Sequence, residues 1–244
     1  IDGVQRDLHD AIEADASVSI ITIDSDEGVE IMRHTLTAQV LARAIKNLYP
    51  KSKLAIGPTV QDGFYYDVES DESISSDDLS KIEEEMKKII KTKSAITKKL
   101  VSKKEALKIF KSNKEPYKEI IINESDQDDN FQLYYQDDEE FVDLCRGPHL
   151  PNLGFIGSFK LTKVSGAYWK GDSKNSMLTR IYGTAFSNDK DLQNHLDNIE
   201  EALKRDHRKL GKEMDLFHFQ DEAPGMVFWH PNGWTVYRLS LIHI

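Results

Sequence analysis

The order of helix-like and strand-like patterns along the chain is the feature that most constrains its fold. Residues 36–48 carry apolar side chains at three- and four-residue spacing, as one face of a helix requires, and Pro50 ends the pattern. Two β-like runs follow at 54–60 and 63–68, separated by a Gln-Asp-Gly turn suited to a hairpin. Because helices and strands come in separate blocks, the sequence predicts an α+β fold rather than a doubly wound α/β sheet.

Capping signals place further helices. Ser75 or Ser76 is expected to cap one helix, and Ser102 with Glu105 forms a capping box for a shorter one. From 117 to 184 the pattern is mainly short strands and glycine-rich turns, and a long amphipathic helix is predicted from 189 to 209.

The first residues are expected to belong to a separate small domain. Their pattern predicts a short helix over 4–13 and a strand over 17–23, closed by an acidic turn at 24–28. Thr35 or Thr37 is the expected cap of the helix that follows this turn.

Composition narrows the class of protein. With 39% hydrophobic residues and no apolar run near the ~18 residues of a membrane span, a soluble protein is expected. The net charge of −10 argues against a sequence-independent nucleic-acid binder, although lysines between Lys87 and Lys118 form either a solvated face or a phosphate-binding one. A single cysteine excludes an internal disulfide and fits a reducing cytoplasm, and no charged-then-apolar leader follows Ile1, which argues against a signal peptide.

The segment 141–149 carries the most chemistry. A strand-like run breaks at a Gly-Pro turn, which returns His149 toward Asp143 and Cys145. Four readings stay open: a cysteine nucleophile with a base, a zinc site that includes His34, a polar pocket for ester hydrolysis, and a buried cysteine beside a turn histidine without function.

Several motifs resemble the threonyl-tRNA synthetase family in the same order, from about residue 1 to Arg238. They are Ile-Gly-Pro at 56–58, Gly-Phe-Tyr-Tyr-Asp at 63–67, Asp-Leu-Cys-Arg-Gly-Pro-His at 143–149, Gly-Ala-Tyr-Trp at 166–169 with Gly-Asp at 171–172, Arg-Ile-Tyr-Gly-Thr at 180–184, Arg-Asp-His-Arg-Lys at 205–209, and Glu-Ala-Pro-Gly-Met at 222–226 with Phe-Trp-His at 228–230.

The resemblance implies a domain order. It comprises the C-terminal part of a ubiquitin-like TGS domain at 1–24, a two-part α+β editing domain at 27–188, a connector helix at 189–213, the start of a class II aminoacylation domain at 214–238, and a non-native tail at 239–244.

The resemblance also implies a function. The family joins threonine to its tRNA with ATP, and its editing domain hydrolyses seryl-tRNA formed in error. ATP, Mg and Zn are expected for the full-length parent and no cofactor for this fragment. The expected partner is threonine tRNA mischarged with serine. The parent is expected to be a homodimer in the cytoplasm, the fragment a monomer, and neither is expected to enter a membrane.

An editing step has a physical reason. Serine is threonine without one methyl group, and a pocket gains only about 1–3 kcal/mol from such a group. A second pocket that admits serine but excludes the methyl group corrects what the first site accepts.

By resemblance, Asp143, Cys145 and His149 match the editing-pocket motif, and Lys118 matches a lysine that positions water or stabilises charge. We expect Lys118 and His149 to hold the attacking water and the oxyanion. Asp143 and Cys145 would contact the substrate's amine and side-chain hydroxyl. The motif Tyr65, Tyr66 and Asp67 is expected to line the same pocket.

One position departs from the family. Its members usually carry two histidines four residues apart in the first editing-domain helix, whereas here Ala38 lies four residues after His34 and Gln39 lies five. Counting back from Ala44-Ile-Lys46 instead places Thr35 and Gln39 at the two positions. Five residues turn about 140° around an α-helix, so His34 and Gln39 would share a pocket only if His34 lay in the cap. His34 is expected to be catalytic, Gln39 is expected to bind substrate together with the Tyr65–Asp67 motif, and no metal is expected.

Two other functions remain as alternatives. One is a freestanding metal-dependent aminoacyl-tRNA deacylase, which bound-metal analysis would identify. The other is a non-catalytic tRNA-binding module, in which the altered helix marks lost hydrolysis.

Overall fold

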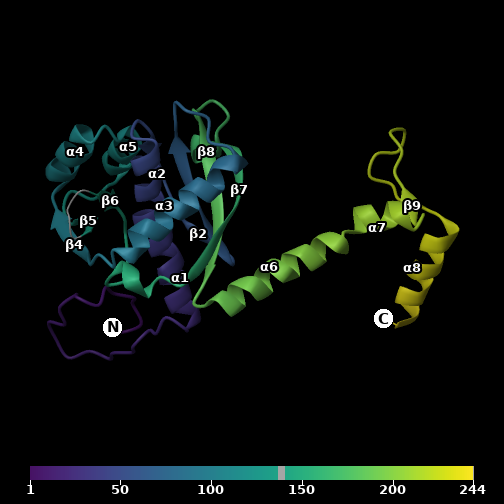
Figure 1. Ribbon diagram of the computed structural model, residues 1–244, viewed down its shortest axis with the longest axis horizontal. Helices are drawn as coiled ribbons and strands as arrows, with labels where there is room; N and C mark the ends of the chain where they lie inside the picture. Colours follow the sequence, from purple (N-terminus) through teal and green to yellow (C-terminus); the bar gives the residue numbers. More distant parts are fainter. Residues whose placement is uncertain (137–140, 244) are drawn as a thin grey trace. The chain divides into compact units, whose positions relative to one another are not determined.

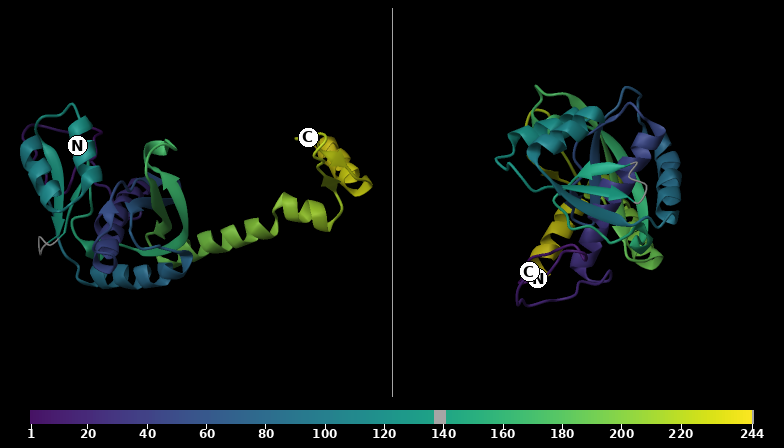
Figure 2. Two further views of the ribbon diagram at one scale, coloured as in Figure 1. Left: turned by 90° about the horizontal axis from the view of Figure 1, so that it is seen from above. Right: turned by 90° about the vertical axis from the view of Figure 1, so that its left-hand side faces the viewer.

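The computed structural model describes residues 1–136 and 141–243. The chain divides into two compact units, Ile1–Leu192 and Gln193–Ile244. The first unit contains helices and two antiparallel sheets (Figures 1 and 2). The mixed α+β class predicted from the sequence is therefore confirmed.

The long helix over residues 26–48 begins with α1 (Asp26–Thr35). Its cap is Ser25, whose side chain accepts a hydrogen bond from the Gly28 N–H at 3.1 Å. The expectation that Thr35 or Thr37 caps this helix is wrong. Both residues lie inside it, and their hydroxyls donate to helix carbonyls four residues earlier, at 2.8 and 2.7 Å.

The middle of the same helix is a π-helix, η1 (Leu36–Leu41), before α2 (Ala42–Leu48) resumes the α-helical pattern. The Ala42 N–H donates to the Thr37 carbonyl, five residues earlier. All six residues of η1 are buried. A turn closed over five residues holds one residue more than an α-helical turn, so η1 changes which residues share a face.

The larger sheet has the strand order β1-β3-β8-β7, and β2 pairs with β3. Its hairpin confirms the predicted turn, because Val60 pairs with Gly63 and Thr59 with Phe64. Helices α1, η1 and α3 contact the sheet and enclose the main core with it. The strands are β1 (Lys53–Leu54), β2 (Thr59–Val60), β3 (Gly63–Glu69), β7 (Ser158–Tyr168) and β8 (Met177–Phe186), and α3 is Leu79–Lys91.

The smaller sheet has the order β4-β5-β6 and packs with two helices around a second core. Ser102 caps the first helix as predicted, by accepting a hydrogen bond from the Glu105 N–H at 3.3 Å. The elements are β4 (Ile96–Val101), α4 (Lys103–Ser112), α5 (Pro116–Glu124), β5 (Phe131–Gln136) and β6 (Val142–Leu144).

The described residues of the first unit also form three short 3-10 helices. Ser75 caps η2 through a capping box with Asp78, which confirms the helix start predicted there. The three are η2 (Ser76–Asp78), η3 (Leu153–Phe155) and η4 (Trp169–Gly171).

Residues 1–24 form neither the predicted helix at 4–13 nor the predicted strand at 17–23. A strand needs partners for its backbone hydrogen bonds, and none of the described strands pairs with this segment. Val18 and Ile20 are 56% and 84% exposed, so they do not contribute to the core.

The predicted helix at 189–209 is divided in two. The helix α6 (Asp189–Lys204) crosses from the first unit into the second, and α7 (His207–Glu213) follows it. Asp206 caps α7 by accepting a hydrogen bond from the Arg208 N–H at 2.8 Å, and this cap begins a new helix.

The second unit ends with a two-stranded ladder and a helix. These are β9 (Phe217–His218), β10 (Phe228–Trp229) and α8 (Pro231–His243), so residues 239–243 continue a helix. Within the described part of the chain, no helix combines the length and apolar character that crossing a membrane requires.

Glu83 of α3 ties the main core to the sheet. Its buried carboxylate accepts hydrogen bonds from the Leu161 N–H at 2.8 Å and from Lys160 at 3.0 Å. We expect Glu83→Ala to lower the free energy of unfolding by about 1–3 kcal/mol, because the Leu161 N–H loses its partner. Glu84→Ala, on the exposed side of the same helix, is the matched control in denaturant unfolding. Equal stability of the two variants would contradict this assignment.

Candidate active site

Side chains from two segments that are far apart in the sequence meet at the end of α1. His34 Nε2 lies 2.7 Å from Cys145 Sγ, and the rings of His34 and His149 are 4.7 Å apart. His34 comes from the last turn of α1, and the other two come from the segment after β6. The long helix and the Gly-Pro turn together therefore bring His34, Cys145 and His149 into one cluster.

Thr35 sets the state of His149. Its hydroxyl donates to the Ile31 carbonyl at 2.8 Å and accepts from the Leu150 N–H at 3.0 Å. His149 Nδ1 lies 3.1 Å from the same oxygen. Because the hydroxyl proton is already used, we assign the imidazole proton to Nδ1, which leaves Nε2 with a free lone pair.

This lone pair is buried and unpartnered. His149 is 4% exposed, and its Nε2 has no hydrogen-bond partner among the described residues. Burial, together with the charge of His34, lowers the pKa of His149 well below its ordinary value. His149 is therefore neutral near pH 7 and can accept a proton from water.

Cys145 is a thiol rather than a thiolate. Burial raises the pKa of Cys145 to about 11, and burial also lowers the pKa of His34. The thiol therefore donates toward the neutral imidazole of His34. A nucleophilic cysteine needs its thiolate form, so this geometry favours a polar contact over covalent catalysis.

A buried ion pair adjoins this cluster. Lys118 Nζ lies 2.5 Å from Asp143 Oδ1, and the two side chains are 4% and 3% exposed. The same oxygen accepts from the Leu144 N–H at 2.8 Å. Burial raises the pKa of Asp143, while the Lys118 charge opposes this. A fixed ammonium beside a neutral base can stabilise charge that develops on a carbonyl oxygen.

The three residues of the Tyr65–Asp67 motif do not share one face. Tyr66 is fully buried, and Lys118 lies 5.9 Å from the centre of its ring. Its two neighbours point to the opposite side of β3, because strand side chains alternate. There Asp67 accepts two hydrogen bonds from Arg180, at 2.6 and 2.7 Å, and Arg180 stacks on the Tyr65 ring. Only Tyr66 thus adjoins the ion pair.

Gln39 is buried in η1 and hydrogen-bonds Gln136, while its own Nε2 has no partner among the described residues. Gln136 Nε2 donates to the Gln39 carbonyl at 2.7 Å. His34 does not lie in a helix cap, since α1 begins at Asp26. The π-helical turn η1 holds one residue more than an α-helical turn, and it begins after His34 and includes Gln39. The angle between His34 and Gln39 around the helix axis is therefore not the roughly 140° of a regular α-helix.

The cluster fits a metal ion poorly. One ligand atom from each of His34, Cys145 and His149 lies within 4.8 Å of the others. However, two ligands of one tetrahedral zinc stand about 3.5 Å apart, given bond lengths of roughly 2.0–2.3 Å. The 2.7 Å contact between His34 and Cys145 is shorter than that. The observed spacing is that of a hydrogen bond.

Three further residues complete the site. One register of the helix motif had indicated Thr35, and no motif indicated Tyr134 or Asp7. Thr35 orients His149, and the Tyr134 ring meets the His149 ring edge-on at 4.4 Å. Asp7 accepts from the His149 backbone N–H at 2.9 Å. Tyr134 pairs with Asp143 across β5 and β6, so strand pairing could have indicated it. No local pattern marks Asp7.

The buried neutral histidines predict a pH dependence of stability. Below about pH 6.5 the unfolded chain protonates both His34 and His149, whereas the folded chain resists protonation, so stability is lost as pH falls. The expected slope is up to about 1.4 kcal/mol per pH unit for each residue. In His149→Gln the free energy of unfolding should fall less steeply between pH 6.5 and 5.5, because the contribution of one buried histidine is gone. His9→Gln, at an exposed position, should keep the slope of the unsubstituted chain. Urea unfolding at several pH values measures this; an unchanged slope in His149→Gln would refute it.

Comparison with known proteins finds similar sequences over nearly the whole chain. Residues 132–182, which carry Tyr134, Asp143, Cys145 and His149, match the family model described as threonyl and alanyl tRNA synthetase second additional domain. A threonine–tRNA ligase of Prochlorococcus marinus is 52% identical over 239 residues, which is 97% of this chain and 37% of the relative. One of Psychrobacter arcticus is 50% identical, over 98% of the chain and again 37% of its own length. The chain spans little more than a third of these relatives, and within that span it belongs to the threonine–tRNA ligase family.

Proposed function

We propose that the first unit hydrolyses the ester of seryl-tRNA that was formed in error on threonine tRNA. The observation that carries this proposal is the unpartnered Nε2 of His149, a neutral buried base in the cluster whose other members, His34 and Cys145, interact with the Lys118–Asp143 pair. Relatives named threonine–tRNA ligase and the matched domain supply the class of substrate. The whole protein, in this proposal, joins threonine to tRNA with ATP, Mg and Zn in the cytoplasm and works as a dimer.

The proposed reaction is attack of water on the ester carbonyl. His149 Nε2 accepts a proton from the water as its oxygen bonds to the carbonyl carbon. The Lys118 ammonium stabilises the oxyanion. When the carbon–oxygen bond to the ribose breaks, His149 returns the proton to the ribose oxygen. Serine and tRNA leave, and the imidazole is neutral again.

The remaining polar groups recognise the amino acid. The Asp143 carboxylate pairs with the substrate ammonium, and the Cys145 thiol, held by His34, contacts the side-chain hydroxyl. Thr35, Tyr66 and Tyr134 form the buried surroundings. In such a close-packed pocket the additional methyl group of threonine has no space, so its ester is expected to remain intact.

The domain boundaries follow from this proposal. Residues 27–188 are the editing domain, 189–213 the connector, and 214–238 the beginning of the aminoacylation domain. Residues 1–24 belong to a preceding TGS domain, and residues 239–244 are foreign to the family pattern.

The first test is deacylation of seryl-tRNA and threonyl-tRNA by the full chain, with His149→Ala as the inactive control. We expect loss of serine at least about 100-fold faster than in the variant, since a general base contributes 10²–10⁴-fold. Threonyl-tRNA should be stable. Equal rates for the chain and the variant would reject the role of His149.

Metal analysis of the purified chain separates a metal-dependent deacylase from this mechanism. We expect activity to persist after chelation, because His34 and Cys145 contact each other directly. Stoichiometric zinc, together with loss of activity on chelation, would favour the metal-dependent reaction instead. Folded protein that binds tRNA but leaves both esters intact would indicate the non-catalytic module.

A further inference from the structure

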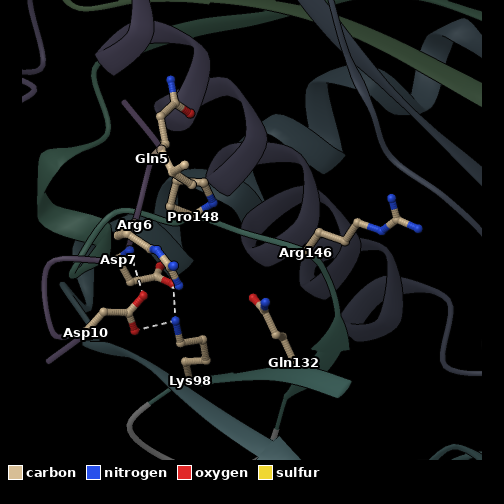
Figure 3. Close-up of a pocket in the computed structure, with 9 residues that line it drawn as sticks. Gln5, Arg6, Asp7, Asp10, Lys98, Gln132, Arg146 and Pro148 are labelled. Atoms are coloured by element: carbon tan, nitrogen blue, oxygen red, sulfur yellow. Dashed lines mark hydrogen bonds and ion pairs between the residues drawn. The ribbon is translucent and has the colours of Figure 1, made fainter. Parts of the chain in front are cut away.

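A cavity of about 310 Å³, with charged side chains in its lining, lies beside the proposed active site. The N-terminal segment forms one wall, and β4, β5 and the turn before His149 form the other (Figure 3). Its volume falls at the small end of the range for ligand sites, roughly 300–1,000 Å³. Its polar lining includes Gln5, Arg6, Asp10, Lys98, Gln132 and Arg146.

The cavity and the active site share one turn of backbone. Arg146 directly follows Cys145, and Pro148 directly precedes His149; both Arg146 and Pro148 line the cavity. Asp7 connects the two sites, since its carboxylate accepts from the His149 N–H at 2.9 Å and from the Tyr134 hydroxyl at 2.8 Å. The cavity therefore lies next to the turn that carries Cys145 and His149.

The charges of the lining favour an anion. Lys98 is paired with Asp7 at 2.8 Å and with Asp10. Arg146 is exposed and extends away from this group, with Gln132 between them (Figure 3). Among the described residues neither Arg146 nor Arg6 has an ion-pair partner. Three cations against two acids give this cavity a positive balance in a chain of net charge −10.

The substrate of the proposed function presents an anion at this point. Its amino acid is esterified to the terminal ribose, and the nearest charge beyond that ribose is the phosphodiester to the preceding nucleotide. Guanidinium groups bind phosphate oxygens in a planar, bidentate geometry. The side-chain amides of Gln132 and Gln5 offer both donors and acceptors for the edge of a base.

We infer that this cavity is the subsite for the phosphodiester and nucleotide that precede the terminal adenosine of the RNA, with Arg146 as its phosphate-binding residue and Arg6 as a second cation. This inference rests on the proposed function. It gives the N-terminal segment a direct part in substrate binding, since Gln5 and Arg6 lie across the cavity from Arg146.

The test compares two substrates in the full chain and in Arg146→Ala. Seryl-tRNA carries the phosphodiester, whereas a serine ester of adenosine presents the same bond without it. We expect Arg146→Ala to lower kcat/KM for seryl-tRNA roughly tenfold or more, mainly through KM, as loss of a charged hydrogen bond would. Cleavage of the adenosine ester should change less than about twofold, since that substrate never makes the lost contact.

Two controls make the comparison specific. Lys104→Ala removes the same charge from an exposed position in α4, and this variant should cleave both substrates as fast as the unsubstituted chain does. Arg146→Lys keeps the charge but loses the bidentate geometry, so its effect on seryl-tRNA should be intermediate. In Arg146→Ala the salt dependence of binding to a short RNA ending in CCA should decrease by about 0.7 in log–log slope.

The outcomes separate the inference from the proposed function. Equal slowing of both substrates in Arg146→Ala would show that Arg146 supports His149 through the shared turn, and would overturn the inference. No effect on either substrate would also overturn it. If the unsubstituted chain hydrolyses neither ester, the proposed function fails, and the affinity for RNA decides the inference. Weaker and less salt-dependent RNA binding by Arg146→Ala would then support the subsite. Unchanged RNA binding would reject it.

Discussion

The buried ion pair between Lys118 and Asp143 is the interaction on which the site depends. It joins α5 to β6, two elements of the smaller sheet module, at the border of the main core. A buried pair of this kind gains little net stability, because both charges leave water. Removing one partner, however, leaves the other uncompensated. The pair therefore fixes the relation between α5 and β6, and with it the position of an ammonium group near Cys145.

The second constraint is the way in which the long helix meets the turn after β6. Thr35 contacts His149 and Leu150 at once, so one hydroxyl sets both a tautomer and the path of the backbone. His34 and Cys145 then make a pair of neutral groups in direct contact. The site thus combines a neutral half, suited to accepting a proton, with a charged half, suited to stabilising an oxyanion. His149, Lys118 and Asp143 are buried, which strengthens their electrostatic effect, whereas His34 and Cys145 are partly exposed.

Much of the fold was predictable because it depends on local signals. The hairpin before Gly63 and the caps at Ser75 and Ser102 follow from turn and capping chemistry within a few residues. The cluster of Cys145 and His149 was predictable from one Gly-Pro turn. The start of the first helix was mispredicted because two threonines within it resemble caps, although their hydroxyls bond to the helix itself. Contacts made at long range, such as Asp7 with His149, leave no pattern in the sequence around either residue.

The π-helical turn at Leu36–Leu41 also has a consequence for how such chains change over generations. An added residue in an α-helix normally rotates everything beyond it by about 100°, so that buried side chains turn toward water. A single wide turn absorbs the addition where it occurs, and Met32 before it and Ile45 after it both remain fully buried. Length variation in a family need not then be confined to loops. Buried helices can also accumulate changes in length. A sequence alignment without gaps would then pair the wrong residues on one side of the π-helical turn.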